Sequence, residues 1–476
     1  MIATGSTATR RLDRSARAWL PAAVPTAAAA MYSLAPARAA TMGEKTSRHR
    51  RRTWLPAILL CAITATSVCA ADDEPEDPHL QAIIREALKL NPEIAAASRE
   101  KDAASHRAAS AGALDDPMIE AGLLNVPTNS LRLNQEDMTM KMLGISQRLP
   151  YPGKRGLRES LAAKDVEVVD HGYRETVNRV VRDIRVAYYD LALIDQTYQF
   201  HESNRQLLTR LLQITESRYA VGQGAQADTL KVQTQISKMD EDFLRVLRDR
   251  QSLVAELERL YGRAGQEFMV KLPMPRLRAT DFSVSELRDA AFRDRPQLLG
   301  LKTLIDRNQK ALELAREDYH PDFDLRFQYG QRDKIPDGAP RSDLISMTLA
   351  FNLPLWGKQK LEPKIAEAQA KREQAMSLYQ AQQNELLAKL RVQVAIAEQT
   401  RASARLYQTA LLPQARLTVE SALAAFRVNK VDFAMLLDSQ MAVFNYELDH
   451  AGLVIAFNKA LAEIDLLTGK SVVGAQ

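Results

Sequence analysis

The chain has 476 residues, of which 46% are hydrophobic, 26% charged and only 6% aromatic. This composition excludes a disordered chain and favours long, solvated helices. The formal net charge is +5, but residues 1–70 contribute +8 and leave −3 for the remainder. The basic excess therefore belongs to one terminal segment and does not indicate binding to nucleic acid or to an acidic membrane surface.

That terminal segment has the pattern of a secretory signal peptide. A cationic stretch is followed by an apolar run over residues 54–68 and by small residues suited to cleavage. We therefore predict a signal peptide over residues 42–70, preceded by an unassigned extension over residues 1–41. Translation could begin at Met1 or at Met42.

The two cysteines, Cys61 and Cys69, both fall within the predicted signal. The mature protein is therefore expected to contain no disulfide and no reactive thiol. Attachment of a lipid to Cys69 is an alternative that the sequence leaves open.

The remainder of the chain repeats itself. Landmarks in the first half recur 204 residues later and, further along, 207 residues later: Asn91-Pro92 with Arg295-Pro296, Asp116-Pro117 with His320-Pro321, Gly153-Lys154 with Gly357-Lys358, Val221-Gly222 with Val428-Asn429, and Gly262 with Gly469. Such a period indicates a duplicated unit. We predict a first repeat over residues 80–262, a linker over 263–282, a second repeat over 283–469 and a tail over 470–476.

Each repeat begins with a predicted helix of about thirty residues, which ends before an X-Pro pair. In the second copy, Ser283 and Glu286 form a capping box at its start. Alternating apolar residues then predict two strands, over 118–124 and 137–147 in the first copy and over 323–329 and 345–351 in the second.

A very long helix follows the strands, over residues 158–218 and again over residues 361–425, where only Pro413 is expected to interrupt it. A turn at Gly222 or Asn429 leads into a return helix. Helices of this length pack as coiled coils. The predicted fold is mainly α with a small β part, a strand pair plus a long helical hairpin, present twice.

No catalytic or cofactor site is visible. Residues 222–227 match G-x-G-x-x-A, but a long helix precedes them where a nucleotide fold requires a strand. The seven histidines lack metal-ligand spacing. We therefore expect neither an enzyme nor a bound cofactor.

Other residues suit a channel. Asp228, Asp432 and Asp438 lie near the two turns and could form carboxylate rings at a pore constriction or simply start helices, and both readings stay open. Tyr151 and Trp356 end the strand pairs, where aromatic residues suit a membrane interface. Three alternating methionines are weak candidates for soft-metal ligands, although an apolar strand face is favoured: Met138, Met140 and Met142.

These landmarks resemble the TolC-like outer-membrane efflux family over residues 80–470. The resemblance rests on residues 219–222 with Asp228, residues 426–429 with Asp438, and the strand end at residues 147–155. Residues 136–154 are similar to the heavy-metal and copper efflux branch. Val431 and Met435 depart from the family, since some members place an arginine and an aspartate there.

The resemblance implies a homotrimer in the cell outer membrane, with a twelve-stranded β-barrel and an α-helical tunnel in the periplasm. It also implies two partners, a periplasmic adaptor (membrane fusion) protein and an inner-membrane resistance-nodulation-division pump. The adaptor would dock on six residues of the turns: Tyr219, Val221, Gly222, Phe426, Val428 and Asn429.

We therefore expect an exit duct for heavy-metal cations such as copper/silver or cobalt/zinc/cadmium. A duct for drugs and small organic compounds, a duct for type I protein secretion, and a periplasmic coiled-coil scaffold are the alternatives.

Overall fold

The computed structural model describes residues 77–263, 272–278 and 281–469. The predicted N-terminal extension, the signal peptide with both cysteines, the tail and part of the linker lie outside the described residues.

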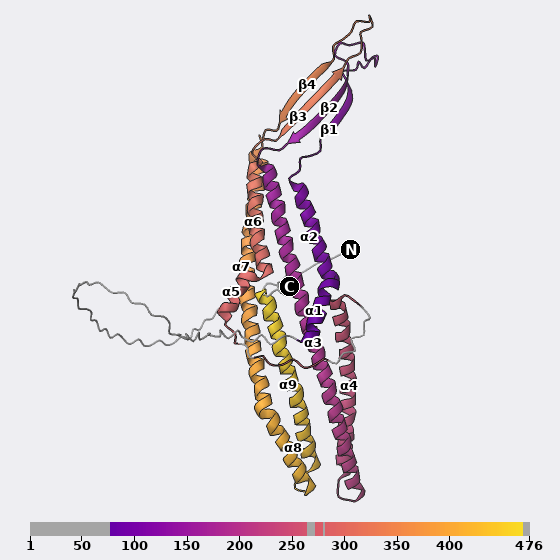
Figure 1. Cartoon of the computed structure of the whole chain (residues 1–476), viewed down its shortest axis with the longest axis vertical. Coiled ribbons are helices and arrows are strands. Elements are labelled where there is room, and N and C mark those ends of the chain that lie inside the picture. The colour runs from indigo at the N-terminus through magenta and orange to yellow at the C-terminus, as the bar shows by residue number, and fades with distance from the viewer. Residues whose placement is uncertain (1–76, 264–271, 279–280, 470–476) are drawn as a thin grey trace, which may run out of the picture. The chain divides into compact units, whose positions relative to one another are not determined.

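The described residues form two sets of elements in the same order (Figure 1). The first set is α1 (Pro78–Leu90), α2 (Pro92–Ala111), β1 (Met118–Leu124), β2 (Met140–Leu149), α3 (Lys154–Ala220) and α4 (Gln226–Tyr261). The second is α5 (Val284–Asp294), α6 (Pro296–Glu317), β3 (Phe323–Gln331), β4 (Leu344–Phe351), α7 (Gly357–Leu406), the π-helical turn η1 (Tyr407–Leu411), α8 (Leu412–Arg427) and α9 (Phe433–Thr468). The predicted fold, a strand pair and a long helical hairpin present twice, is confirmed.

The prediction of a single helix at the start of each repeat is wrong. Each repeat begins with two helices, which are joined at Asn91 in the first and at Arg295 in the second. Both junction residues precede a proline and have extended ψ angles, 122° and 118°. A residue before proline resists the α conformation, and the proline itself cannot donate the next helical hydrogen bond. Asn91 also caps α2, since its Oδ1 accepts hydrogen bonds from the backbone of Glu93 at 2.7 Å and Ile94 at 3.1 Å.

The long helix of the first repeat is continuous, whereas that of the second is not. Helix α3 has 67 residues and is about 100 Å long. In the second repeat the turn η1 lies directly before Pro413, which has no N–H to donate to the carbonyl one turn earlier, so the backbone widens locally into a π-helix. The prediction that Pro413 is the only proline in this helix is wrong, because Pro363 also lies inside α7, where it removes one backbone hydrogen bond without ending the helix.

The four strands form one antiparallel sheet in the order β1-β2-β3-β4. Strand β2 begins three residues later than predicted, because Glu136–Thr139 closes a turn in which the Thr139 hydroxyl donates to the carbonyl of Asn125 at 2.7 Å. Alternation along the strands gives the sheet one apolar, exposed face, which includes Ile119, Leu143, Ile145, Phe327, Tyr329, Ile345, Met347, Leu349 and Phe351.

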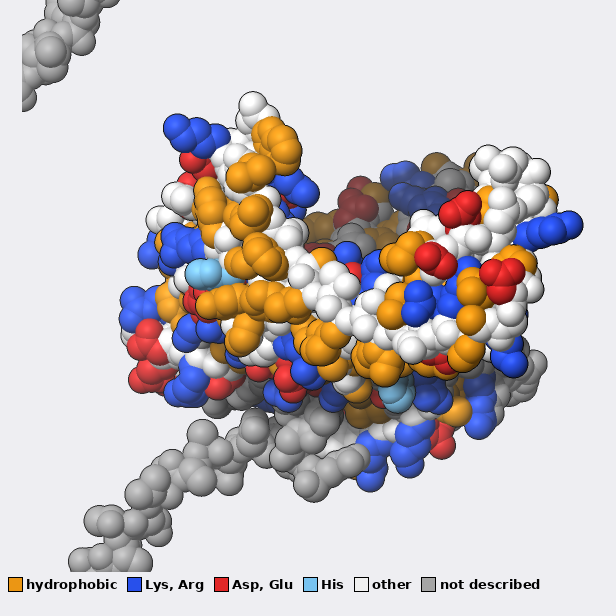
Figure 2. Space-filling model, turned by 90° about the horizontal axis from the view of Figure 1, so that it is seen from above, with side chains coloured by type: hydrophobic (Ala, Val, Ile, Leu, Met, Phe, Trp, Pro, Cys, Tyr) orange, Lys and Arg blue, Asp and Glu red, His pale blue; other side chains and the backbone are white. Residues whose placement is uncertain are grey.

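The end view in Figure 2 shows hydrophobic side chains gathered beside charged ones on this end of the molecule. Among the described residues, no helix combines the length and apolar composition needed to cross a membrane.

Three buried clusters hold the helices together. One joins α1, α3 and α4, and a second joins α5, α7 and α9 in the equivalent part of the other repeat. The third lies towards the two turns and contains residues of α3, α4, α8 and α9, so the two hairpins also pack against each other.

The return helices end against the junctions described above. Gly262 and Gly469 cap α4 and α9 with φ of 83° and 74°, the left-handed conformation that glycine adopts without strain. A Cβ at Gly262 would lie 2.5 Å from the carbonyl oxygen of Leu90, and one at Gly469 would lie 2.7 Å from the Cα of Arg295. Each return helix therefore packs backbone to backbone on the junction of its own repeat.

This contact can be separated from backbone strain by comparing two glycines. Gly222 also has positive φ, but a Cβ there would meet nothing within 4 Å. Alanine at either position carries a strain of about 1–2 kcal/mol, and we expect Gly262→Ala to lose roughly 1–3 kcal/mol more because backbone atoms must move. Thermal unfolding followed by far-UV circular dichroism measures both losses, and equal shifts for the two variants would contradict the packing role of Gly262.

Candidate functional site

The two helix-hairpin turns carry most of the predicted site residues. In the first turn Gly222 has φ of 71°, and the Gln223 N–H donates to the carbonyl of Arg218 at 2.8 Å. In the second, Asn429 takes the equivalent place with φ of 59°. Apolar side chains project to solvent at both turns: Tyr219 is 50% exposed, Val221 67% and Val428 62%.

Phe426 does not belong to this exposed set, although the sequence suggested it. It is only 7% exposed, because its ring packs edge-on against Phe433 at 5.7 Å and beneath the guanidinium of Arg218 at 4.4 Å. The prediction that Phe426 lies on the docking surface is therefore wrong, and the residue instead anchors the second turn.

Arg218 links the two turns within one protomer. It extends from the last turn of α3, and its Nη1 donates to the carbonyl of Phe426 at 3.4 Å. Its Nη2 donates to the side-chain oxygen of Asn429 and, at 3.4 Å, to the carbonyl of Gln223. The sequence does not reveal this role of Arg218, because a basic residue in a last helical turn is ordinary and nothing local predicts a partner 211 residues away.

The three acidic candidates differ in their surroundings. Asp432 caps α9, with its Oδ1 accepting a hydrogen bond from the backbone of Met435 at 3.0 Å. Asp228 lies half-buried in the first turn of α4, and Asp438 is exposed on α9. Among the described residues no lysine, arginine or histidine side chain forms an ion pair with Asp228 or Asp438. Within one protomer both carboxylates therefore remain free to bind another group.

The two strand ends have unequal packing. Tyr151 stacks on His320 at 4.4 Å, and the neighbouring Lys154 is almost fully buried, with its Nζ donating to the carbonyl of His320 and to Asp322, both at 2.8 Å. Trp356, at the equivalent end of β4, is 67% exposed. The first strand end is thus packed within the chain, whereas the second is open.

The structure divides the three methionines. Met138 precedes β2 and is exposed. Met140 and Met142 lie on the face opposite to Leu143 and Ile145, shared with polar residues such as Glu120, Ser146, Arg326 and Gln328. The interpretation of all three as part of an apolar strand face is therefore wrong. Met138 lies outside the strand, and Met140 and Met142 lie on the face that carries polar residues.

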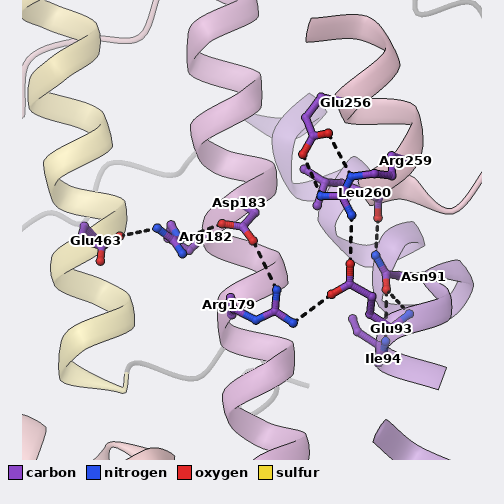
Figure 3. A network of polar contacts seen from close by, with 10 residues as sticks. All are labelled: Asn91, Glu93, Ile94, Arg179, Arg182, Asp183, Glu256, Arg259, Leu260 and Glu463. Carbon is purple, nitrogen blue, oxygen red and sulfur yellow. Dashed lines mark hydrogen bonds and ion pairs between the residues drawn. The ribbon is translucent and has the colours of Figure 1, made fainter. Parts of the chain in front are cut away.

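A chain of ion pairs joins four helices near the α1–α2 junction (Figure 3). Glu93 binds Arg179 of α3 at 2.9 Å and Arg259 of α4 at 3.0 Å. Asp183 lies between Arg179 at 3.9 Å and Arg182 at 2.9 Å. Arg182 reaches Glu463 of α9 at 2.8 Å, so the chain crosses from the first repeat into the second. The hydrogen bond from Arg179 lowers the pKa of Glu93, whereas burial raises the pKa of Asp183.

Over the residues that the structure describes, no group of three or more His, Cys, Asp or Glu side chains could hold a metal ion. The charged residues instead form ion pairs that join helices to one another. Exposed apolar side chains lie at the turns and on one face of the sheet.

Comparison with known proteins decides the identity. The family model described as "Outer membrane efflux protein" matches residues 83–263. Residues 83–263, which span most of the first repeat, therefore belong to this family. The protein is therefore an efflux channel of the outer membrane, with its helical part in the periplasm, and not an enzyme.

Individual relatives of this efflux channel agree with the family. The cobalt-zinc-cadmium resistance protein CzcC of Cupriavidus metallidurans is 21% identical over 435 residues, covering 88% of this chain and all of CzcC. The structure of CusC, described in connection with transmembrane channel formation, superposes with a TM-score of 0.69 at 14% identity, covering 83% of this chain and 92% of CusC. The outer membrane protein VceC of Vibrio cholerae gives 0.68 at 18% identity, with 82% and 96% covered.

The Glu93 ion pairs predict a pH-dependent stability. Because the folded-state pKa of Glu93 is lowered, its charge stabilises the fold above the unfolded-state pKa, and this contribution is lost as the pH falls through the folded value. We expect Glu93→Gln to lower the free energy of unfolding at pH 7 by on the order of 1 kcal/mol or less, since the ion pair is partly exposed, and thermal unfolding measures this loss.

The difference from wild type should disappear well below pH of about 4.3, the ordinary pKa of glutamate. Glu86→Gln, on an exposed part of α1, is the matched control and should behave as wild type at every pH. A Glu93→Gln deficit that persisted in acid would assign the effect to packing rather than charge.

Arg218→Ala should release the second turn from the first. Stacking on Phe426 and the charged hydrogen bonds together contribute about 1–2 kcal/mol locally, so we expect trypsin to cut at Arg427 or Lys430 roughly 5–30 times faster. The exposed Arg210→Ala serves as control. Unchanged cleavage at the second turn in Arg218→Ala would show that Arg218 does not hold it.

Proposed function

We propose that this efflux channel is a homotrimeric exit duct for heavy-metal cations, working with a periplasmic adaptor protein and an inner-membrane resistance-nodulation-division pump. The observation that supports the metal substrate best is the similarity to CzcC along its whole length. The fold alone would suit drugs or secreted proteins equally well.

Unequal packing of the two repeats supports a ring-shaped assembly. Helix α3 packs against α2 and α4 of its own repeat and also against α6 and α9 of the second. Helices α7 and α8 pack against α6 and α9, with no comparable packing on α2 or α4 in the described part of the chain. A second copy, placed as the second repeat is placed on the first, would supply the missing helices.

The surfaces left open fit that arrangement. Apolar side chains are exposed along α7 and α8 at Met376, Leu378, Val392, Ile396, Leu406 and Leu417, and along α4 at Leu230, Leu244 and Leu247. Strands β1 and β4 form the two edges of the sheet, and unpaired edges seek partners. A head-to-tail contact of this kind closes into a ring, and three copies would give a twelve-stranded barrel.

The turns would then form the periplasmic end of the duct. Exposed apolar groups at Tyr219, Val221 and Val428, beside the turn residues Gly222 and Asn429, suit an adaptor surface. Asp228, Asp432 and Asp438 repeated around the axis would favour cations at a constriction. Adaptor binding would favour an open arrangement of the turns that the free protein populates less.

A gene-deletion strain tests the substrate. We expect reduced growth on at least one of copper, silver, zinc, cobalt and cadmium, restored by the intact gene, with unchanged tolerance of a drug panel. The protein should fractionate with the outer membrane as a heat-modifiable oligomer.

Equal survival of both strains on every metal would refute the metal assignment. Sensitivity confined to drugs would favour a duct for small organic compounds, and loss of an exported polypeptide would favour protein secretion. A water-soluble monomer would refute the assembly.

A further inference from the structure

A buried cluster of soft donor groups lies between the two hairpins, away from every residue predicted above. Asn204 of α3 contacts Met239 on α4 and Met441 on α9, and His201 lies one turn earlier on α3, against Phe444 of α9. These helices come from both repeats and meet in the cluster that packs below the turns.

The two methionine sulfurs converge on one point. The side-chain nitrogen of Asn204 lies 3.3 Å from the Sδ of Met239 and 3.8 Å from the Sδ of Met441. An amide N–H is a partial positive charge, so both thioethers face a position occupied by an electropositive group. Gln440 approaches the same amide, with its Nε2 at 3.5 Å from the Asn204 oxygen.

His201 adds an unused nitrogen one turn away. Its side chain is 6% exposed, and its Nδ1 has no hydrogen-bond partner within the described residues. The ring packs edge-on against Phe444, one turn beyond Met441 on α9, at 5.1 Å. Burial lowers the pKa of His201, with Asp242 of α4 opposing it, because burial disfavours the charged imidazolium. A buried polar atom without a partner is unusual and calls for an explanation.

We propose that His201, Met239 and Met441 form a binding site for a soft monovalent cation, Cu(I) or Ag(I). Thioethers select such ions, and neutral imidazole suits copper. Zinc and cobalt favour His, Cys and carboxylate sets, which the described residues do not assemble. In the metal-free protein the Asn204 amide satisfies the two sulfurs, and it turns aside when the cation binds.

Occupying the site would join the first hairpin to the second. The ligands come from α3, α4 and α9, so a bound cation stabilises the packing of these helices by mass action. Binding of the exported cation at this site would thereby change the stability of the helix packing next to the turns. The statement that this cation is also the exported substrate rests on the proposed function, whereas the binding site itself does not.

Silver titration of the detergent-solubilised channel, in chloride-free buffer, tests the site directly. We expect X-ray absorption of the silver complex to show sulfur and nitrogen ligands, and the unfolding temperature to rise with silver. Met239→Leu and Met441→Leu keep volume and apolarity, so they should fold normally. Each should weaken binding by more than about tenfold, because even outer-shell changes at metal sites cost 10–100-fold.

Two further variants separate ligands from neighbours. His201→Phe keeps the ring packing on Phe444 but should remove the nitrogen signal and weaken binding. Asn204→Ala removes the competing amide and should strengthen binding. Met347→Leu, at an exposed position on β4, is the matched control and should bind as wild type.

Silver binding that survives Met239→Leu and Met441→Leu together would overturn the proposal, as would binding lost instead in Met140→Leu with Met142→Leu on the sheet. Either result would leave the proposed export function standing. Conversely, a deletion strain with normal metal tolerance would refute export while intact silver binding preserved the site.

Discussion

The structure depends on the contact between each return helix and the junction of the two short helices in its own repeat. Gly262 and Gly469 bring the ends of α4 and α9 so close to Leu90 and Arg295 that no Cβ fits between the backbones. A return helix fixed at that point by backbone atoms cannot slide along its partners. Since α4 and α9 each have 36 residues, the same contact sets where both hairpin turns fall.

The polar groups around this contact distinguish the two repeats. In the first, the Asn91 side chain donates to the carbonyl of Leu260 at 2.7 Å, so the junction is tied to its own return helix. In the second, Arg295 replaces the asparagine and pairs with Glu175 of α3 at 3.4 Å. One junction therefore closes its own repeat, while the other fastens the second repeat to the first. The backbone contact is common to both repeats, whereas the side chain at the junction differs and in the second repeat pairs with the first.

Local signals explain what the sequence could predict. Prolines, glycines and period-two alternation act on neighbouring residues, so the duplication, the strand pairs and the turn positions followed from them. Several of the errors concern partners distant in sequence. Phe426 looked exposed because nothing nearby reveals that Arg218 covers it. The soft-donor cluster escaped for the same reason, since its methionines are 202 residues apart in the sequence. The break at Asn91 was missed although its signal is local, an asparagine cap directly before Pro92.

A channel constrains where its cargo can be held tightly. Groups that line a route must bind weakly enough to release each ion, because conduction requires exit as well as entry. The carboxylates of Asp228 and Asp438, which have no ion-pair partner among the described residues, would suit that demand in the proposed channel. Buried thioethers and an imidazole suit the opposite demand, because a low-dielectric site off the route can retain a soft cation without obstructing transport. Strong and weak binding are therefore compatible in one chain when they are separated, as they would be in the proposed site between the hairpins and the proposed carboxylate rings at their tips.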